Sequence, residues 1–481
     1  MRLLSSGAEH WSCKPGVESS ILSGGRPYFF GLCVPTVIQR VSCHVGHSIL
    51  VQVQLYAVET KMKDNTPPVS PGPAGVDEEH EFNIDDIGEV IELEDFDIDA
   101  ESPGLSGADD DVDDDMDEEE EEEEAEAAAA AVEDMASLVF TNHKKSVFTC
   151  CVSPDGSLAA SGGEDDMAYI WDVNSGNVLH SCSGHKDSIV QVCFSHDGSL
   201  LATGDLAGYI QVWKVATHTK IWEFEVEELS WMLWHHASHV LLAGTGKGEM
   251  WMWLVPHGNT RTFPSYGSSS TCGAFMRDGK RAVSGYEDGS VRVFDLKSGQ
   301  SVQQWIPEEA KSVPVVSLDT HKDNNLIITG SYDGSARLLN VNNGKVVGNL
   351  NCVVELDNDE EPERPVNHIV EGVSFCPFLP NIAVTSTLAG YITFWDISSQ
   401  VSRHVLAHDC GSSQLKWHPN EPLLYSSGLD GTVRSYDVRS GEPLAEYTGH
   451  TRNVLALDIS RNASVLVTAS DDATVRVFKL S

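Results

Sequence analysis

The sequence has no CxxC pair, and its eleven cysteines show no regular spacing. Such cysteine usage is typical of reduced thiols in a cytosolic or nuclear protein, and it argues against a disulfide framework. The sequence also lacks any apolar run that approaches the ~20 residues a helix needs to span a bilayer. We therefore predict a protein without a membrane span that resides in the cytoplasm, with the nucleus as a further compartment.

Motifs that carry catalysis are also missing. There is no GxSxG nucleophile elbow and no glycine-rich phosphate loop. His235, His236 and His239 lie close together along the chain, and His185 and His196 share one repeat unit. Zinc sites generally combine histidines with cysteines or carboxylates at tight spacing, and we recognise no such set in the sequence. The sequence therefore predicts no enzyme, no metal site and no cofactor.

Basic side chains are absent from one long segment, because no Lys or Arg lies between Lys63 and Lys144. Residues 77–134 instead carry 30 Asp and Glu, and this segment holds most of the formal net charge of −42. Phosphates repel such a segment and gain nothing from counterion release on binding it. The charge therefore argues against direct nucleic-acid binding and favours a basic protein partner.

Two regions precede the repeats described below. Residues 1–61 contain few acids and no secretory signal. We interpret them as an unstructured extension or as a stretch ahead of a usual start at Met62, with an organelle transit peptide as the alternative. Residues 62–134 are predicted to form a disordered acidic tail, because like charges repel and little apolar surface is available to offset the entropy of ordering. Within this tail, 82–98 interleaves apolar and acidic residues, as segments that fold onto a partner do; a solvated tail without a defined contact is the alternative.

Over residues 135–481 the chain repeats a unit that ends in an apolar or aromatic run followed by Asp or a related residue. The unit ends are IWD (170–172), VWK (212–214), MWL (252–254), VFD (293–295), LLN (338–340), FWD (394–396), SYD (435–437) and VFK (477–479). The steps between the aromatic positions, with Leu339 standing in the fifth unit, are 42, 40, 41, 45, 56, 41 and 42 residues. A period of about 40–45 residues with this ending is typical of WD40 propeller blades. The sequence predicts an all-β fold, a WD40 β-propeller of eight four-stranded blades.

The two ends of the repeat region predict how the ring closes. The last unit stops at Leu480, directly after its third strand, so its outermost strand is missing. The segment SLVFT (137–141) lies ahead of the first unit and has the composition of a strand. We expect it to supply the missing strand, because a four-stranded sheet of this kind must stack on neighbours and closure leaves only short edges.

Several units carry the residues of the hydrogen-bond network that WD40 blades often contain. Such His and Asp residues are expected to be buried hydrogen-bond partners and not catalytic groups. In three units the Asp of this network is replaced by another residue: Ala207 in the second unit, Lys247 in the third and Ala389 in the sixth. The complete sets are His143, Ser161, Asp165 and Trp171 in the first unit, His408, Ser426 and Asp430 with Tyr436 in the seventh, and His450, Thr468 and Asp472 with Phe478 in the eighth. The last two networks are expected to be weaker, because Tyr436 and Phe478 lack an indole N–H.

The loops that join an outer strand to the next inner strand, and a second strand to a third, open on one face of a propeller. Many acidic residues fall in these loops, and an acidic face beside an acidic tail is a plausible dock for a segment rich in Lys and Arg. Ordinary solvated loop charges are the alternative. The candidate partner-binding residues are Glu164, Asp187, Glu225, Glu227, Glu228, Glu287, Tyr332, Asp357, Asp359, Glu360, Glu361 and Asp471.

Individual strings are more specific than a generic propeller. They include GGEDDMAYIW (162–171), GHKDSIVQVCFSHDGSLLATGDLAG (184–208), LSWMLWHHASHVLLAGTGKGEMWMWLVPHG (229–258) and the acidic leader IGEVIELED (87–95). From about Met62 onward the chain closely resembles the angio-associated migratory cell protein family. This resemblance implies a cytoplasmic and nuclear WD40 adaptor. Related fungal proteins are chaperones for one basic large-subunit ribosomal protein, whereas animal members are linked to cell migration and heparin binding, for which this sequence shows no basic cluster.

Charge and resemblance together predict a monomeric, non-enzymatic chaperone or assembly factor that binds a basic ribosomal protein during large-subunit biogenesis. Under this hypothesis, salt weakens binding and charge reversal at Glu227, Glu228 and 357–361 abolishes it. One alternative is a signalling scaffold in cell migration and angiogenesis, which would use an apolar patch and be insensitive to salt. Another is a substrate receptor for a cullin ligase, whose WDxR motif the sequence at 436–439 matches only loosely.

Overall fold

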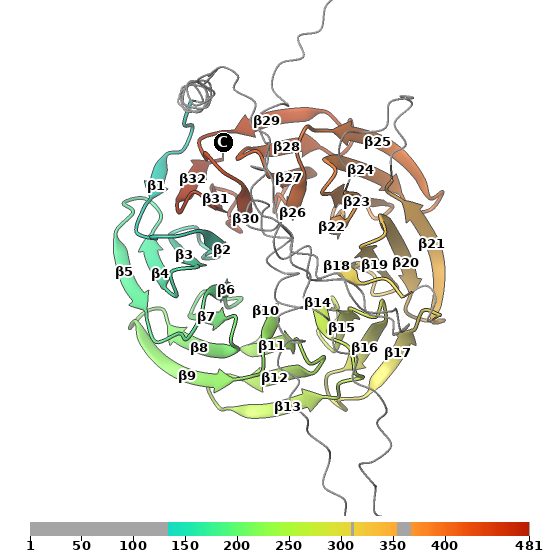
Figure 1. The fold of residues 1–481 in the computed structure, drawn as a ribbon, viewed down its shortest axis with the longest axis horizontal. Coiled ribbons are helices and arrows are strands. Elements are labelled where there is room, and N and C mark those ends of the chain that lie inside the picture. The colour runs from blue at the N-terminus through green and yellow to red at the C-terminus, as the bar shows by residue number, and fades with distance from the viewer. Residues whose placement is uncertain (1–132, 309–311, 354–366, 481) are drawn as a thin grey trace, which may run out of the picture. The chain divides into compact units, whose positions relative to one another are not determined.

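The computed structural model describes residues 133–308, 312–353 and 367–480 (Figure 1). Within these ranges the chain forms 32 β-strands and no helix, so no helix there is long and apolar enough to cross a membrane. The strands form eight separate four-stranded antiparallel sheets arranged as blades around a ring. This confirms the predicted eight-bladed, all-β propeller. The predictions for residues 1–61 and for the tail up to 132 lie outside the described residues.

The first four blades follow chain order from the innermost to the outermost strand. Blade 1 contains β2 (Val147–Val152), β3 (Leu158–Gly163), β4 (Ala168–Asp172) and β5 (Val178–Cys182). Blade 2 contains β6 (Ile189–Phe194), β7 (Leu200–Asp205), β8 (Tyr209–Lys214) and β9 (Thr219–Glu225). Blade 3 contains β10 (Leu229–Trp234), β11 (Val240–Thr245), β12 (Met250–Leu254) and β13 (Asn259–Phe263). Blade 4 contains β14 (Ser270–Phe275), β15 (Arg281–Tyr286), β16 (Val291–Asp295) and β17 (Ser301–Trp305).

The other four blades continue in the same way until the last one, which takes its outer strand from the segment that precedes blade 1. Blade 5 contains β18 (Val315–Thr320), β19 (Leu326–Ser331), β20 (Ser335–Asn340) and β21 (Lys345–Asn351). Blade 6 contains β22 (Val370–Phe375), β23 (Ile382–Thr387), β24 (Tyr391–Asp396) and β25 (Val401–Ala407). Blade 7 contains β26 (Ser412–Trp417), β27 (Leu423–Gly428), β28 (Val433–Asp437) and β29 (Pro443–Tyr447). Blade 8 contains β30 (Val454–Ile459), β31 (Val465–Ser470), β32 (Val475–Lys479) and β1 (Leu138–Phe140).

Burial follows the position of a strand within its blade. Second strands such as β7 and β31 are buried at every residue, because neighbouring blades cover both of their faces. Outer strands such as β5 and β17 alternate between more and less exposed residues, as period-two strands with one covered face do. Eight apolar clusters fill the ring, each built mainly from two adjacent blades. The core is therefore the set of interfaces between blades, and no blade could bury its faces alone.

One interface shows why glycine recurs inside these strands. Trp231 of blade 3 lies between Gly244 and Gly273, and a Cβ on either glycine would come within 2.2 Å of the indole. The indole Nε1 donates a hydrogen bond to Ser270 Oγ at 2.8 Å. A side chain at either glycine would push this tryptophan out of the contact between blades 3 and 4.

The predicted closure by the N-terminal strand is confirmed. Strand β1 pairs antiparallel with β32, with Leu138 opposite Val477 and Phe140 opposite Val475. Phe140 is 2 % exposed, and its ring stacks on that of Trp171 in blade 1 at a centroid distance of 4.6 Å. Blade 8 therefore contains both ends of the propeller, and its apolar cluster connects it to blade 1.

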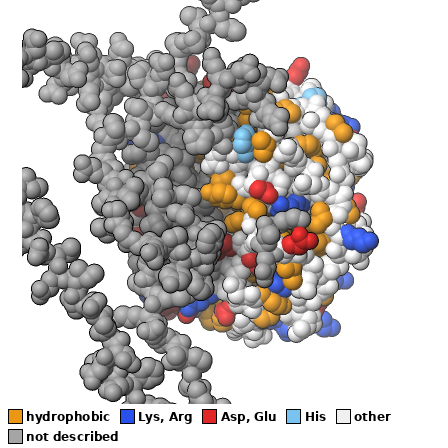
Figure 2. Space-filling view, turned by 45° about the vertical axis from the view of Figure 1, so that its right-hand side comes forward, with side chains coloured by type: hydrophobic (Ala, Val, Ile, Leu, Met, Phe, Trp, Pro, Cys, Tyr) orange, Lys and Arg blue, Asp and Glu red, His pale blue; other side chains and the backbone are white. Residues whose placement is uncertain are grey.

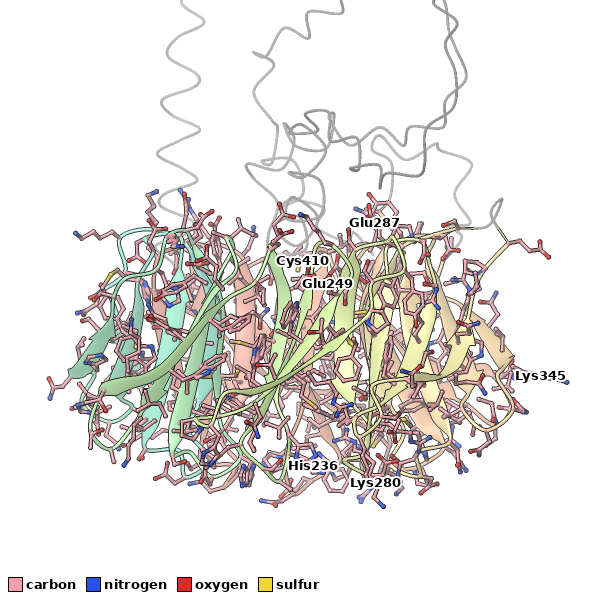
Figure 3. The ribbon with its side chains drawn as sticks, turned by 90° about the horizontal axis from the view of Figure 1, so that it is seen from below. His236, Glu249, Lys280, Glu287, Lys345 and Cys410 are labelled. Carbon is pink, nitrogen blue, oxygen red and sulfur yellow. The ribbon has the colours of Figure 1, made fainter. Side chains whose placement is uncertain are left out.

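The ring has two faces that carry different loops (Figure 3). We define the upper face, uppermost in Figure 3, by the loops from each outer strand to the next inner strand and by the loops between second and third strands. Glu287 and Cys410 lie there. The lower face carries the loops between first and second strands and between third and fourth strands, including those with His236 and Lys280.

Candidate functional site

The upper face is strongly acidic. Its described loops contain fifteen acidic and five basic residues. The acids are Glu164, Asp165, Asp166, Asp187, Glu227, Glu228, Glu249, Glu287, Asp288, Glu308, Asp333, Asp409, Asp430, Asp471 and Asp472, and the bases are Lys144, Lys145, Lys186, Lys247 and Arg452.

The lower face has no such imbalance. Its described loops contain six acids and six bases. The acids are Asp155, Asp197, Asp278, Asp323, Glu421 and Glu442, and the bases are Arg277, Lys280, Lys297, Lys322, Arg439 and Arg461. The negative field of the described propeller therefore emerges mainly from the upper face.

The upper loops are held in place by a repeated backbone contact. In every blade, the residue that follows the second strand donates its N–H to a carbonyl of the loop that enters the same blade. Examples are Glu164 to Ser146 at 2.9 Å and Glu287 to Ser269 at 3.0 Å. The other six donors are Leu206, Gly246, Tyr332, Leu388, Leu429 and Asp471. The backbone that carries these carboxylates is thus already ordered before a partner binds.

The structure places every described candidate from the sequence at this face. Glu164, Glu287, Tyr332 and Asp471 share the one repeated position just named. Asp187, Glu227 and Glu228 lie in the loops that enter blades 2 and 3, and Glu225 is the last residue of β9 beside them. Glu228 is half-buried and has a φ of 50°, so it is part of the loop's framework as well as of its charge. Asp357, Asp359, Glu360 and Glu361 belong to the connection between β21 and β22 and lie outside the described residues.

Lysines on the same face pair with three of these carboxylates. Lys145 Nζ lies 3.4 Å from Glu164 Oε1, Lys186 Nζ lies 2.7 Å from Glu225 Oε2, and Lys247 forms an ion pair with Glu227. All six side chains are well exposed, so these pairs are weak and exchange readily with a competing cation. These lysines lie in or beside the same loops as the acids, so a count of every charge in those loops identifies them from the sequence.

Below the face, four blades contain the buried polar network. In blade 1 His143 lies 3.0 Å from Asp165 and 2.9 Å from Ser161 Oγ, to which Trp171 Nε1 donates at 3.3 Å. In blade 8 His450 lies 2.9 Å from Asp472 and 2.8 Å from Thr468 Oγ1, and Arg476 donates to Asp472 at 3.0 Å. Phe478 has no N–H to donate to Thr468, whereas Trp171 donates to Ser161 in blade 1, and Arg476 contacts the carboxylate, which the indole of blade 1 does not.

Blade 2 corrects one expectation from the sequence. The carboxylate of its network does not come from the position of Ala207. Asp205, two residues earlier, lies 3.2 Å from His185 Nδ1, and Thr203 Oγ1 lies 2.8 Å from His185 Nε2. The loop between β7 and β8 is one residue shorter than that between β3 and β4, so the last residue of β7 can reach the histidine.

Blade 7 contains a different arrangement from the one expected. Tyr436 Oη lies 2.9 Å from His408 Nε2 and 3.2 Å from Ser426 Oγ, so its hydroxyl occupies the place of the indole N–H. Asp430 accepts instead from Arg434 at 2.6 Å. Tyr436 lacks an indole N–H, as the sequence shows, but its hydroxyl takes part in the network, because a phenol can both donate and accept.

Acidification below about pH 6.5 is expected to destabilise the propeller. Burial lowers the pKa of His450, and burial likewise lowers the pKa of His408 below its usual value of 6.5. The unfolded chain then binds protons that the folded chain excludes, so stability is lost as the pH falls from 6.5 toward the folded pKa values. The urea midpoint should fall between pH 7.5 and pH 5.5. H450Q should show a smaller fall relative to its own value at pH 7.5, and an unchanged wild-type midpoint would contradict this account.

The outer rim offers a less suitable binding surface. Val302, Val346 and Val401 on β17, β21 and β25 are each more than half exposed. In the view of Figure 2, apolar side chains on the visible part of the surface lie in separate groups among charged and other polar ones. Scattered apolar residues of this kind are ordinary on soluble proteins and do not indicate a partner.

Comparison with known proteins agrees with this architecture. The family described as "WD domain, G-beta repeat" matches residues 136–172, 176–214, 259–295, 303–340, 400–437 and 441–479. The third and sixth units are not matched, yet both form complete blades.

Several relatives cover most of the propeller. The chain is 40 % identical to the angio-associated migratory cell protein of Canis lupus familiaris over 350 residues, which are 72 % of this chain and 80 % of that protein. It is 39 % identical to the human protein of the same name over the same shares. The ribosome assembly protein SQT1 of Saccharomyces cerevisiae is 23 % identical over 380 residues, 71 % of this chain and 86 % of that protein.

Two solved structures share the fold. The crystal structure of Saccharomyces cerevisiae Sqt1 has a TM-score of 0.65 at 21 % identity and covers 72 % of this chain and all of that one. The structure of Chaetomium thermophilum Sqt1 bound to the N-terminus of the ribosomal protein L10 has a TM-score of 0.65 at 23 % identity, with the same coverage.

Proposed function

Because this chain belongs to the angio-associated migratory cell protein family of WD40 proteins, we propose that it is a binding chaperone whose upper face holds a Lys- and Arg-rich segment of a ribosomal protein. The observation that supports this most directly is the excess of fifteen acids over five bases in the upper loops, against equal numbers below. A basic segment would be attracted to one face of the ring and not to the other.

The chemistry of such a chaperone is charge neutralisation. Three carboxylates of this face are paired with exposed lysines, and an incoming cation replaces each lysine without burying either charge. The acids that the blades themselves hold, such as Asp165 and Asp472, stay with their histidines and keep the loops in place. The bound segment would be shielded from RNA until it is handed to its assembly site.

The choice of a ribosomal protein rests on the Sqt1 relatives. One of them is bound to the N-terminus of ribosomal protein L10, and another is named a ribosome assembly protein. A propeller of the same fold with an acidic upper face suits such a ligand. The acidic stretch of residues 77–134 adds carboxylates to the same chain and would raise the encounter rate of a basic partner.

The test is a titration of the full chain with a peptide from the N-terminus of the equivalent ribosomal protein of the same organism. We expect saturable binding with one site at 50 mM NaCl and clear weakening at 500 mM NaCl, because the Debye length falls from above 10 Å to a few ångströms. A polylysine peptide of equal length is the control for non-specific attraction.

Two outcomes would contradict the proposal. Equal affinity for the ribosomal peptide and for polylysine would mean that the face attracts any polycation. Absence of peptide binding, together with salt-insensitive capture of membrane or signalling proteins from cytosol by the full chain, would favour the signalling scaffold instead.

A further inference from the structure

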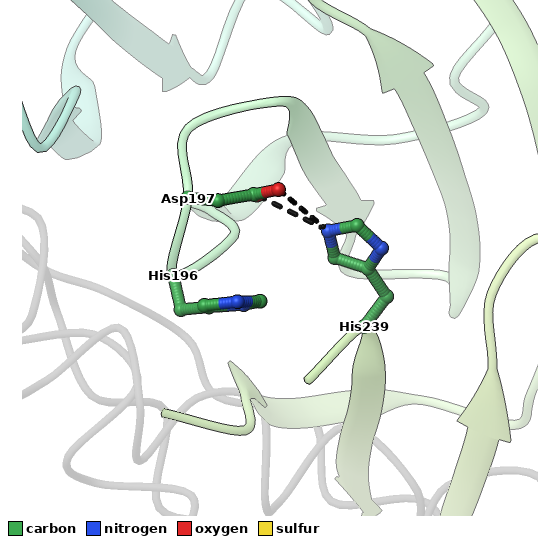
Figure 4. A group of neighbouring side chains, drawn as sticks. All are labelled: His196, Asp197 and His239. Carbon is green, nitrogen blue, oxygen red and sulfur yellow. Dashed lines mark hydrogen bonds and ion pairs between the residues drawn. The ribbon is translucent and has the colours of Figure 1, made fainter. Parts of the chain in front are cut away.

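Two neighbouring blades bring three metal-binding side chains together on the lower face (Figure 4). His196 and Asp197 lie in the β6–β7 turn of blade 2, and His239 ends the β10–β11 turn of blade 3. One ligand atom of each residue lies within 4.8 Å of the others. His239 Nε2 lies 3.1 Å from both carboxylate oxygens of Asp197, and the rings of His196 and His239 are 5.4 Å apart. No other group of three such residues occurs in the part of the chain that the structure describes.

The turn around Asp197 has an ordinary structural role, which blade 1 shows without histidines. In blade 1 Ser153 Oγ donates to Asp155 at 2.6 Å and Ser157 N donates at 3.2 Å. In blade 2 Ser195 Oγ and Ser199 N make the same contacts to Asp197, at 2.7 and 3.1 Å. The turn therefore needs its Asp but not the histidines, because Pro154 occupies the position of His196 in blade 1, and a serine ends the same turn in blades 1 and 2 (Ser157 and Ser199) where His239 ends it in blade 3.

The histidines are thus additions to a turn that folds without them, and one is incompletely satisfied. His196 Nδ1 is buried, and no described residue offers it a hydrogen bond. Buried polar atoms usually have a partner, so an imidazole nitrogen that has none, beside a carboxylate and a second imidazole, is available to bind an ion. Two imidazoles and one carboxylate are a donor set that Zn²⁺ and related ions accept.

We propose that His196, Asp197 and His239 bind a divalent transition-metal ion of the zinc type across blades 2 and 3. The 3.1 Å between His239 Nε2 and Asp197 Oδ2 is a few tenths of an ångström shorter than the ligand–ligand edge of about 3.3–3.6 Å in a tetrahedron whose metal–ligand bonds are about 2.0–2.2 Å, so a small separation of the two side chains would admit the ion. His196, whose ligand atom lies within 4.8 Å of the other two, completes the set, and solvent would provide the remaining position. Imidazole ligands favour zinc, copper or nickel over calcium and magnesium, which prefer oxygen.

The ion would join two blades that are otherwise connected here by the His239–Asp197 ion pair and by a contact of His239 with Ser199 Oγ at 3.2 Å. The site lies on the face opposite to the proposed protein-binding surface, so the two proposals stand independently.

The experiment uses the full chain, stripped with EDTA, dialysed and titrated with ZnCl₂ in competition with a chromophoric chelator at pH 7.5. H196P and H239S are the test variants, because each copies the residue that blade 1 uses at the same position. His236 lies in the same turn as His239 but is not one of the three grouped side chains, so the variant H236A serves as the control. The acidic segment and the other histidines are common to all four proteins, so any binding they contribute cancels in the comparison.

We expect wild type and H236A to bind one more zinc equivalent than H196P and H239S, or to bind it at least about 10-fold more tightly. Loss of a residue that only hydrogen-bonds to a metal ligand already lowers metal affinity by about this factor, so loss of a ligand should lower it at least as much. Zinc should raise the thermal midpoint of wild type and H236A but not of the two test variants. At pH 5.5 the difference should shrink, because protons compete for the imidazoles. Equal stoichiometry and affinity in all four proteins would overturn the proposal, as would a zinc-induced midpoint shift that H196P and H239S retain.

Discussion

Reversal of three upper-face carboxylates, in the variant E164K/E225K/E227K, is expected to weaken binding of the ribosomal peptide on the order of 100-fold at low salt, at about 1 kcal/mol for each residue. The side chains are 44 %, 58 % and 66 % exposed, so their reversal should leave the fold intact. Each reversal removes an attraction, adds a repulsion and leaves a neighbouring lysine without its partner. Calorimetric titration at 50 mM NaCl measures the change, and the affinity of the variant should respond little to added salt.

A matched control separates the location of the charge from its amount. D323K/E421K/E442K changes the net charge of the chain by the same amount but acts on exposed residues of the lower face. It should bind the peptide about as well as the wild type. Equal losses in the two variants would show that only total charge matters, and the upper face would then not be the site.

A second control tests whether the ion pairs themselves are recognised. K186E/E225K exchanges the partners of one pair and keeps both the net charge of the face and the attraction between the two side chains. A small effect is expected if the summed field attracts the peptide. We leave Glu228 unchanged in these variants, because it is half-buried at a φ of 50° and its replacement would disturb the loop as well as the charge.

The largest expected effect on stability comes from the closing strand. F140A should destabilise the propeller by about 3–5 kcal/mol, the usual cost of removing a buried phenylalanine from a core. Phe140 is 2 % exposed, stacks on Trp171 and belongs to the cluster that joins blade 8 to blade 1. The variant weakens the one blade that is assembled from both ends of the repeat region, so the whole ring should open more readily. Urea unfolding followed by tryptophan fluorescence measures the loss.

V139A in the same strand is the control. Val139 is 37 % exposed and lies between two residues whose side chains face the blade, so its truncation should cost less than about 1 kcal/mol. Resistance to limited proteolysis should separate the two variants in the same order. If F140A unfolds at the wild-type urea concentration, closure by β1 does not contribute to the stability of the ring.

Much of the fold could be predicted because its information is local. Each blade end lies about 40–45 residues from the next, and each strand alternates or fills with apolar residues within its own few positions. The blade number, the order of strands and the closing role of 137–141 follow from such patterns. The third and sixth units form complete blades although their endings or lengths depart from the repeat, because neighbouring blades cover any four-stranded sheet of the right size.

The site was predicted less completely, and particular residues show why. The sequence placed acids on one face correctly, since the loop type alone decides the face. It did not reveal that Lys145, Lys186 and Lys247 reach three of those acids, because each pair joins separate loops. The repeat spacing also assigned Ala207 to the place of the network Asp in blade 2, where the structure has Asp205. Counting residues takes no account of the β7–β8 loop, which is one residue shorter than the β3–β4 loop.

Local sequence patterns specify a ring of eight blades, the strand that closes it, and an acidic charge concentrated in one segment and in one class of loop. Three features depend instead on how the blades pack: which charges meet across loops, which carboxylate contacts His185, and the proximity of His239 to Asp197. The last pair is separated by 42 residues, one blade repeat, so the two turns become neighbours only when blades 2 and 3 pack. Local patterns specify a blade, whereas contacts between blades depend on packing that no single repeat contains.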